Sequence, residues 1–184
     1  MAQTYAPEPL KYFVAVLYRD SEALESGKRE LVTRWGLLDF EGEDHAFDIT
    51  DYYEPEMGAP LFRRLVSFEL LRSPTELVGM KLGCNAIEDA IAIAGKRCVN
   101  LDAGYLDHNK VVLASAKGRG QKIYLNNGIY ADPVGFYKDG RYQPFHWTFP
   151  DFKDDRYDRE LLAIRRIYLR QMREWRTHQN AQQG

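Results

Sequence analysis

Cysteine is scarce in this sequence. Only Cys84 and Cys98 occur among 184 residues, and their separation does not match a Cys-x-x-Cys motif. Two cysteines are too few for the disulfide framework that stabilises small secreted domains. We therefore predict two buried free thiols and a fold held together by an apolar core, which 45% apolar residues can supply.

Long apolar runs are also missing. No segment approaches the roughly 18–20 consecutive apolar residues that a membrane-spanning helix needs, and residues 1–9 lack the basic and apolar regions of a signal peptide. This pattern predicts a cytoplasmic protein with no membrane partner. The net charge is only −2, so no overall electrostatic field favours nucleic acid.

Motifs for metal or hydrolase chemistry are absent as well. The four histidines are scattered, and none stands at ligand spacing from a cysteine or a second histidine. Residues 115–122, SAKGRGQK, are rich in glycine and cations but do not form a P-loop. We expect no cofactor and no metal site, with a divalent cation bound by carboxylates as the alternative.

Hydrophobic periodicity predicts a mixed order of strands and helices. Residues 10–20 read as a strand, and Ser21 caps a helix that Gly36 ends. Residues 73–76, SPTE, form a capping box for a second helix that runs to Ala94. Further strands are predicted at 46–49, 61–71, 98–101, 111–116, 121–125 and 129–137, and a closing helix at 154–177.

These elements indicate an α+β protein with an antiparallel sheet. Their order matches the ferredoxin-like βαββαβ arrangement as far as the strand at 98–101, extended by a C-terminal β-meander and a terminal helix. In an alternative arrangement the later strands form a separate barrel-like half. We predict a single domain over residues 1–177 and a disordered polar tail at 178–184.

Three long segments are unusual in composition. They are FDITDYYEPEMG at 47–58, VNLDAGYLDHNKVVLASAK at 99–117 and IYLNNGIYADPVGFYKDGRYQPFHWTFPDF at 123–152. Together with YFVAVLYRD at 12–20, they resemble an uncharacterised bacterial family, domain-of-unknown-function family 4416. The resemblance implies no activity, so any function must be argued from the residues.

The first polar segment lies at the end of the predicted strand at 46–49. It combines carboxylates, a hydroxyl and two phenols: Asp48, Thr50, Asp51, Tyr52, Tyr53 and Glu54. We predict Asp48 and Asp51 as catalytic acid or base groups and the other four as substrate contacts. Turn-stabilising bonds from the aspartates and packing of the tyrosines would give the same pattern without any site.

The second polar segment spans residues 100–110 and leads into an apolar strand. If Asp102 and Lys110 face one cleft, the aspartate can act as a base while the lysine neutralises a phosphate or carboxylate. We predict these two as catalytic residues and Asn100 and Tyr105 as substrate contacts. An Asp-rich turn with a lysine ion pair would look the same in sequence.

Two further cations complete the predicted site. Arg63 lies in the strand predicted at 61–71, and Lys117 lies in the glycine-rich segment. The sequence therefore predicts an enzyme or binding protein for a small anionic, phosphorylated ligand. Its cleft would be formed by loops 48–58 and 100–117.

The closing helix supplies an alternative. Residues 154–177 carry seven arginines beside an apolar stripe, a pattern that suits a nucleic-acid-associated module. The apolar stripe of helix 155–177 could instead dock on a partner or on a second copy of the chain. Long arginine stems also cover apolar surface without any partner. No aromatic RNP-type strand accompanies the helix, so the sequence does not favour RNA.

Overall fold

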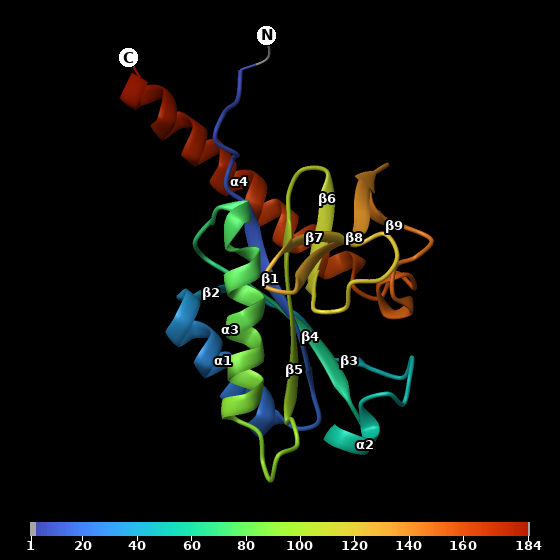
Figure 1. Ribbon diagram of the computed structural model, residues 1–184. Helices are drawn as coiled ribbons and strands as arrows, with labels where there is room; N and C mark the ends of the chain where they lie inside the picture. Colours follow the sequence, from blue (N-terminus) through green and yellow to red (C-terminus); the bar gives the residue numbers. More distant parts are fainter. Residues whose placement is uncertain (1–2, 184) are drawn as a thin grey trace.

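One antiparallel sheet organises the protein. The computed structural model describes residues 3–183, and nine strands within this range form a sheet in the order β2-β4-β1-β5-β6-β8-β7, with β3 on β4 and β9 on β8 (Figure 1). The strands are β1 Lys11–Tyr18, β2 Leu38–Glu41, β3 His45–Ala46, β4 Phe62–Phe68, β5 Val99–Leu106, β6 Lys110–Ser115, β7 Ile123–Asn126, β8 Ile129–Lys138 and β9 Arg141–Pro144. The helices are α1 Ser21–Trp35, α2 Glu54–Met57, α3 Leu77–Ala90 and α4 Asp158–Gln183, with 3₁₀ turns at Pro74–Glu76 and Pro150–Phe152.

The α+β class and the antiparallel sheet with a terminal helix are as predicted. The four strands β2-β4-β1-β5 lie side by side, and every pairing among them is antiparallel. The chain order is not a plain βαββαβ, because β3 and α2 come between β2 and β4. The later strands continue the same sheet and form no separate half.

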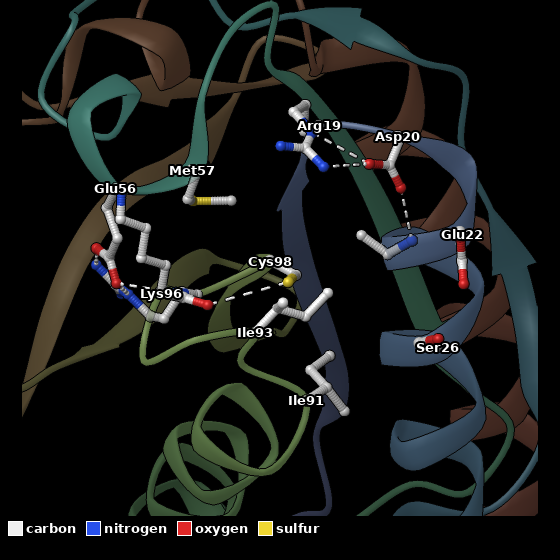
Figure 2. Close-up of a pocket in the computed structure, with 12 residues that line it drawn as sticks. Arg19, Asp20, Glu22, Ser26, Glu56, Met57, Ile91, Ile93, Lys96 and Cys98 are labelled. Atoms are coloured by element: carbon white, nitrogen blue, oxygen red, sulfur yellow. Dashed lines mark hydrogen bonds and ion pairs between the residues drawn. The ribbon is translucent and has the colours of Figure 1, made fainter.

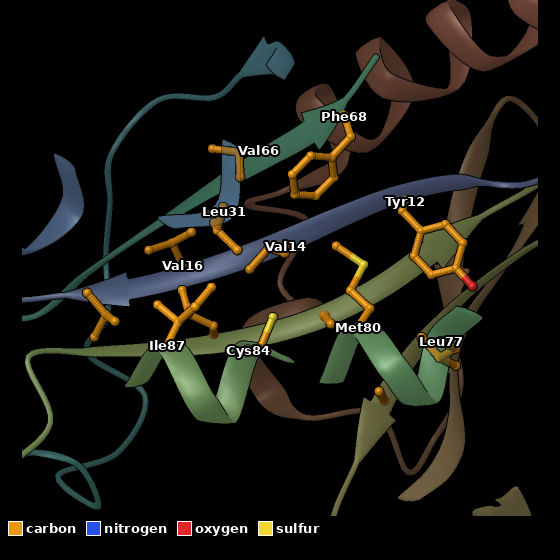
Figure 3. Packing of buried hydrophobic residues seen from close by; sticks show 14 of the residues in the cluster. Tyr12, Val14, Val16, Leu31, Val66, Phe68, Leu77, Met80, Cys84 and Ile87 are labelled. Carbon is orange, nitrogen blue, oxygen red and sulfur yellow. The ribbon is translucent and has the colours of Figure 1, made fainter. Parts of the chain in front are cut away.

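β1 separates two apolar cores. All eight of its residues are buried, because it pairs with β4 on one side and β5 on the other. Val14 and Val16 join the core beneath α1 and α3, where Figure 3 shows them beside Cys84 and Ile87. Phe13 and Ala15 join the opposite core, which α4 covers. This alternation is the two-residue period of a strand buried on both faces.

The helices begin and end close to the predicted positions. Asp20, one residue before Ser21, caps α1 by accepting a hydrogen bond from the backbone N–H of Ala23 at 2.9 Å. The capping box of Ser73 and Glu76 is present before α3. α3 ends four residues earlier than predicted, because the chain turns through positive φ at Ala94 and Gly95 and closes the turn by pairing Ile93 with Lys96.

α4 covers the face of the sheet opposite α1 and α3. Its apolar stripe, Leu161, Ile164, Tyr168 and Met172, is buried against β1 and its neighbours. The stripe predicted as a docking surface therefore packs on the protein's own sheet. The helix also continues to Gln183, through most of the tail that the sequence predicted to be disordered.

The sheet splits between β5 and β6. β1 pairs along the whole of β5, but β6 pairs only with residues 104–106 before it turns to follow β8. Gly104 stands at the branch point, where a Cβ atom would lie 2.7 Å from the carbonyl oxygen of Val112. The backbone of residues 99–103 therefore has an edge that β6 does not cover.

The second polar segment is mostly strand, because β5 continues to Leu106, beyond the strand predicted at 98–101. Asn100 and Asp102 alternate with Leu101 and Ala103 along β5, so the polar side chains lie on the face opposite the α1/α3 core. The turn itself is limited to residues 107–109. Sequence reading mistook a two-residue alternation for a polar loop.

The two thiols differ in environment. Cys84 is buried in the α1/α3 core, whereas Cys98 is only half-buried, which corrects the prediction of two buried thiols. Burial raises the pKa of the Cys84 thiol to about 12. Since the thiolate is the reactive form, we expect only Cys98 to react in the folded protein.

Titration with a thiol reagent checks this difference. The folded protein should release one equivalent of chromophore near pH 8, and a second only on unfolding in denaturant. The Cys98→Ser variant should then show no reaction until it unfolds. Reaction of both thiols at the same rate in the folded protein would contradict the burial of Cys84.

Candidate functional site

The gap between β5 and β6 holds a polar cavity of about 330 Å³, within the size range of small-molecule sites. We call it the split-sheet cavity. Its walls come from α3, β5, β6, the loop before α2 and the 3₁₀ turn at 150–152. Charged and amide side chains dominate the lining: Arg63, Lys81, Asn85, Glu88, Arg97, Asn100, Asp102, Lys117, Lys122, Asp132 and Asp151.

Two side chains from α3 cover the open edge of β5. Lys81 donates a hydrogen bond through Nζ to the carbonyl oxygen of Leu101 at 2.8 Å. Glu88 accepts one from the N–H of Leu101 at 2.7 Å through Oε1. These bonds replace those that a neighbouring strand would make, and unpaired buried backbone groups are costly. Both charged residues are buried, with exposed fractions of 7% and 5%.

A buried guanidinium lies at the bottom of the cavity. Arg63 is 3% exposed and bonds Asp151 through Nη1 and Asp102 through Nη2, the latter at 3.2 Å. The ring of Phe47 lies under it at 4.7 Å. Burial raises the pKa of the Asp151 carboxyl above its ordinary value despite the neighbouring guanidinium. Asp102 also accepts a hydrogen bond from the side-chain amide of Asn100 at 3.0 Å.

Two lysines form the opposite wall. Lys117 lies over the ring of Tyr52 at 4.8 Å, with no carboxylate partner among the described residues. Lys122 bonds the hydroxyl of Ser115 at 2.8 Å and approaches Asp132 only to 3.4 Å. Neither ammonium is fully occupied by protein acceptors. The two lysines can therefore bind an anion.

Arg97 joins this cavity to a second hollow. It holds Glu56 through Nε and Nη2 at 2.8 and 2.7 Å, and reaches Asn100 through Nη1 at 2.9 Å. The second hollow, of about 350 Å³, lies between the start of α1, α2 and the loop after α3 (Figure 2). This second hollow is slightly larger than the split-sheet cavity. Its charged residues Arg19 and Asp20, however, pair with each other at the surface. We place the site in the split-sheet cavity because its lining includes buried charged groups, namely Arg63, Lys81, Glu88 and Asp151.

The structure brings half of the predicted site residues together. Six line the split-sheet cavity: Tyr52, Tyr53, Arg63, Asn100, Asp102 and Lys117. They come from both predicted loops, and strand β4 contributes Arg63. Their roles in binding or catalysis stay predictions.

The other six do not join this cavity. Asp48 pairs with Arg156 at 3.1 Å in a separate surface hollow, and Lys110 pairs with Asp107 beside Tyr105 in another. Thr50 accepts a hydrogen bond from the backbone of Tyr52, while Asp51 and Glu54 are exposed. Of the four predicted catalytic residues, only Asp102 therefore lines the split-sheet cavity.

Sequence reasoning missed Lys81, Glu88 and Asp151. The two helical residues had a detectable signal, because they fall on the buried face of α3 with Leu77 and Cys84. A charge on an apolar helix face requires a partner when buried. Asp151 lies within an aromatic run, FPDF, that matches no catalytic or binding motif. Lys81 now takes the place beside Asp102 that the sequence assigned to Lys110.

Two features are absent from residues 3–183. No group of three or more His, Cys, Asp or Glu side chains in this range is placed to hold a metal ion. No helix in the same range is long and apolar enough to cross a membrane.

The pH dependence of stability should report the burial of Glu88. Burial raises the pKa of its carboxyl above the ordinary value of 4.5, so its contribution to stability is present below that pH and is lost as the pH rises through the folded-state pKa. The free energy of unfolding of Glu88→Gln relative to the native protein should therefore rise from about pH 4 to about pH 7 in urea denaturation.

Glu56→Gln is the matched control with the opposite sign. The bond to Arg97 lowers the pKa of Glu56, so its contribution is present above the ordinary value and is lost in acid. The relative stability of Glu56→Gln should fall over the same rise in pH. Parallel profiles for the two variants would contradict the assigned burial of Glu88.

Comparison with known proteins identifies the family. A family model described as a domain of unknown function, DUF4416, matches residues 8–168, a range that includes every residue lining the split-sheet cavity. Comparisons with curated proteins and with solved structures each returned no match. Because the matched range covers most of the 184 residues, the chain belongs to the DUF4416 family of domains of unknown function.

Proposed function

We propose that this protein binds a small phosphorylated anion in the split-sheet cavity, as an enzyme or as a binding protein. The observation that carries the proposal is the state of Lys81. Its ammonium is buried, yet it makes one hydrogen bond, and its nearest carboxylate oxygens are 3.8 and 3.9 Å away on Asp102 and Glu88. An ammonium has three N–H donors, so Lys81 retains donors for an oxygen of the ligand.

The opposite wall supports the same ligand. Lys117 and Lys122 add two incompletely paired ammonium groups to the same cavity. Lysine binds phosphate as a compact charge. Lys117 is exposed and Lys122 is half-buried, so a ligand from solvent can reach both. The aromatic rings of Tyr52 and Phe149 flank the opening and leave an apolar surface for the body of the ligand.

In an enzyme, Asp102 would be the catalytic base of this site. One of its oxygens bonds Arg63 and Asn100, while the other faces Lys81 without a hydrogen bond. A carboxylate held in this way can accept a proton from a bound hydroxyl. In a binding protein, the same oxygen would select a ligand that carries a donor.

A divalent cation stays a proposal. The described residues provide no cluster of three metal-binding side chains, so a cation would need ligand oxygens to complete its coordination. Binding experiments with and without Mg²⁺ test this directly.

The arginine-rich helix supports a second function less well. The apolar stripe of α4 is buried on the protein's own sheet. Some of its arginines also pair within the chain, as Arg159 does with Glu43 and Arg176 with Glu8. Partner binding, nucleic-acid binding and self-association through α4 therefore lack a specific observation in their favour.

Phosphate binding should depend on the lysines of the cavity. Lys117→Ala should weaken binding of glucose 6-phosphate about tenfold, because losing a hydrogen bond from a charged group costs about 1.5 kcal/mol. Lys122→Ala should act in the same direction. Isothermal titration measures the affinity, and the ligand-induced rise in melting temperature checks it.

Lys110→Ala is the matched control. Lys110 is a lysine of the originally predicted site, but it pairs with Asp107 outside the cavity, so its loss should leave affinity unchanged. Equal weakening by Lys110→Ala and Lys117→Ala would contradict the location of the site. No binding of phosphate or any phosphate ester by the native protein would contradict the function itself.

A further inference from the structure

Two carboxylate oxygens beside Arg63 have no hydrogen-bond donor. Asp151 and Asp102 each bond the guanidinium through Oδ2. Asp151 is 0% exposed, and its Oδ1 is buried without a partner. Oδ1 of Asp102 has Lys81 at 3.8 Å, which is too long for a hydrogen bond. Both residues line the split-sheet cavity.

An unpartnered buried carboxylate oxygen is exceptional in a folded protein. Buried polar atoms almost always find a partner, because leaving one unpaired forfeits its hydration without replacement. Oδ1 of Asp151 is such an atom, whereas the free Oδ1 of Asp102 belongs to a side chain that is 25% exposed. Both carboxylates are held by one guanidinium. A ligand with two neighbouring donors would satisfy both.

The charges around these oxygens favour neutral donors. Arg63, Lys81 and Arg97 already surround the two aspartates and Glu88 on this wall. These three cations already balance the three carboxylates, so a ligand ammonium would add an uncompensated charge to a partly buried site. Hydroxyl groups donate equally well without adding charge.

We infer that the ligand is a hydroxylated phosphate monoester, whose phosphate lies against Lys117 and Lys122 and whose neighbouring hydroxyls donate to Oδ1 of Asp102 and Asp151. This inference rests on the proposed phosphate-binding function and adds the chemical class of the rest of the ligand. Asp151, which follows from no sequence motif, thereby becomes a specificity-determining residue.

Matched ligand pairs test the inference on the native protein. Glycerol 3-phosphate and propyl phosphate differ only in two hydroxyls. Glucose 6-phosphate and cyclohexylmethyl phosphate are a second pair with a larger body, in which only the sugar carries hydroxyls. Isothermal titration in EDTA should show the hydroxylated member of at least one pair binding about tenfold tighter or more, as expected for hydrogen bonds to charged acceptors. Equal affinity within both pairs would overturn the inference.

Variants assign the preference to the aspartates. Asp102→Asn should reduce the affinity ratio within the preferred pair severalfold, whereas a purely structural role would weaken both members equally. Asp48→Asn, in a surface carboxylate outside the cavity, should leave the ratio unchanged. Asp151→Asn should also reduce it, with circular dichroism showing whether the variant folds. An unchanged ratio in Asp102→Asn would overturn the inference.

The outcomes separate this inference from the proposed function. If inorganic phosphate and all four esters fail to bind, the proposed function fails first. If the esters bind without preference for hydroxyls, only the inference fails. Tighter binding of 3-aminopropyl phosphate than of glycerol 3-phosphate, or a hydroxyl preference seen only with Mg²⁺, would also overturn it, because either result replaces neutral hydroxyl donors with a cation.

Discussion

The capping of β5 by Lys81 and Glu88 is the interaction on which the rest of the site depends. A strand buried beneath a helix cannot leave its backbone groups unpaired, so the departure of β6 at Gly104 requires other partners for Leu101. α3 supplies them as an ammonium and a carboxylate. The same two side chains that complete the sheet therefore place charge at the wall of a cavity.

This arrangement buries charged groups, and each buried charge requires a partner of opposite charge. Arg63 stands between Asp102 and Asp151, and Arg97 links Glu56 to Glu88 across the cavity wall. Such networks are costly to bury and contribute little net stability. The incomplete pairing of Lys81 and Asp151 is the feature on which the proposed ligand binding rests.

The sequence predicted the fold class and the strand at β1 because their patterns are local. The capping box before α3 and the helical period of α4 were visible for the same reason. The site was only half visible. Asp102 meets Arg63 because β5 and β4 both pair with β1, and it meets Lys81 because α3 packs on the sheet. Neither contact can be predicted from the spacing of these residues in the sequence. Lys110 was chosen because it is near Asp102 in the chain, although the hairpin carries it away.

The most direct test of the central claim is a map of ligand contacts by NMR. The amide resonances of the protein are followed while inorganic phosphate and then glucose 6-phosphate are added. The account predicts the largest shifts at residues 100–102 on β5 and at residues 115–117 at the end of β6, on the two sides of the cavity. Shifts confined to residues 48–51, to the hairpin at 107–110 or to α4 would contradict it.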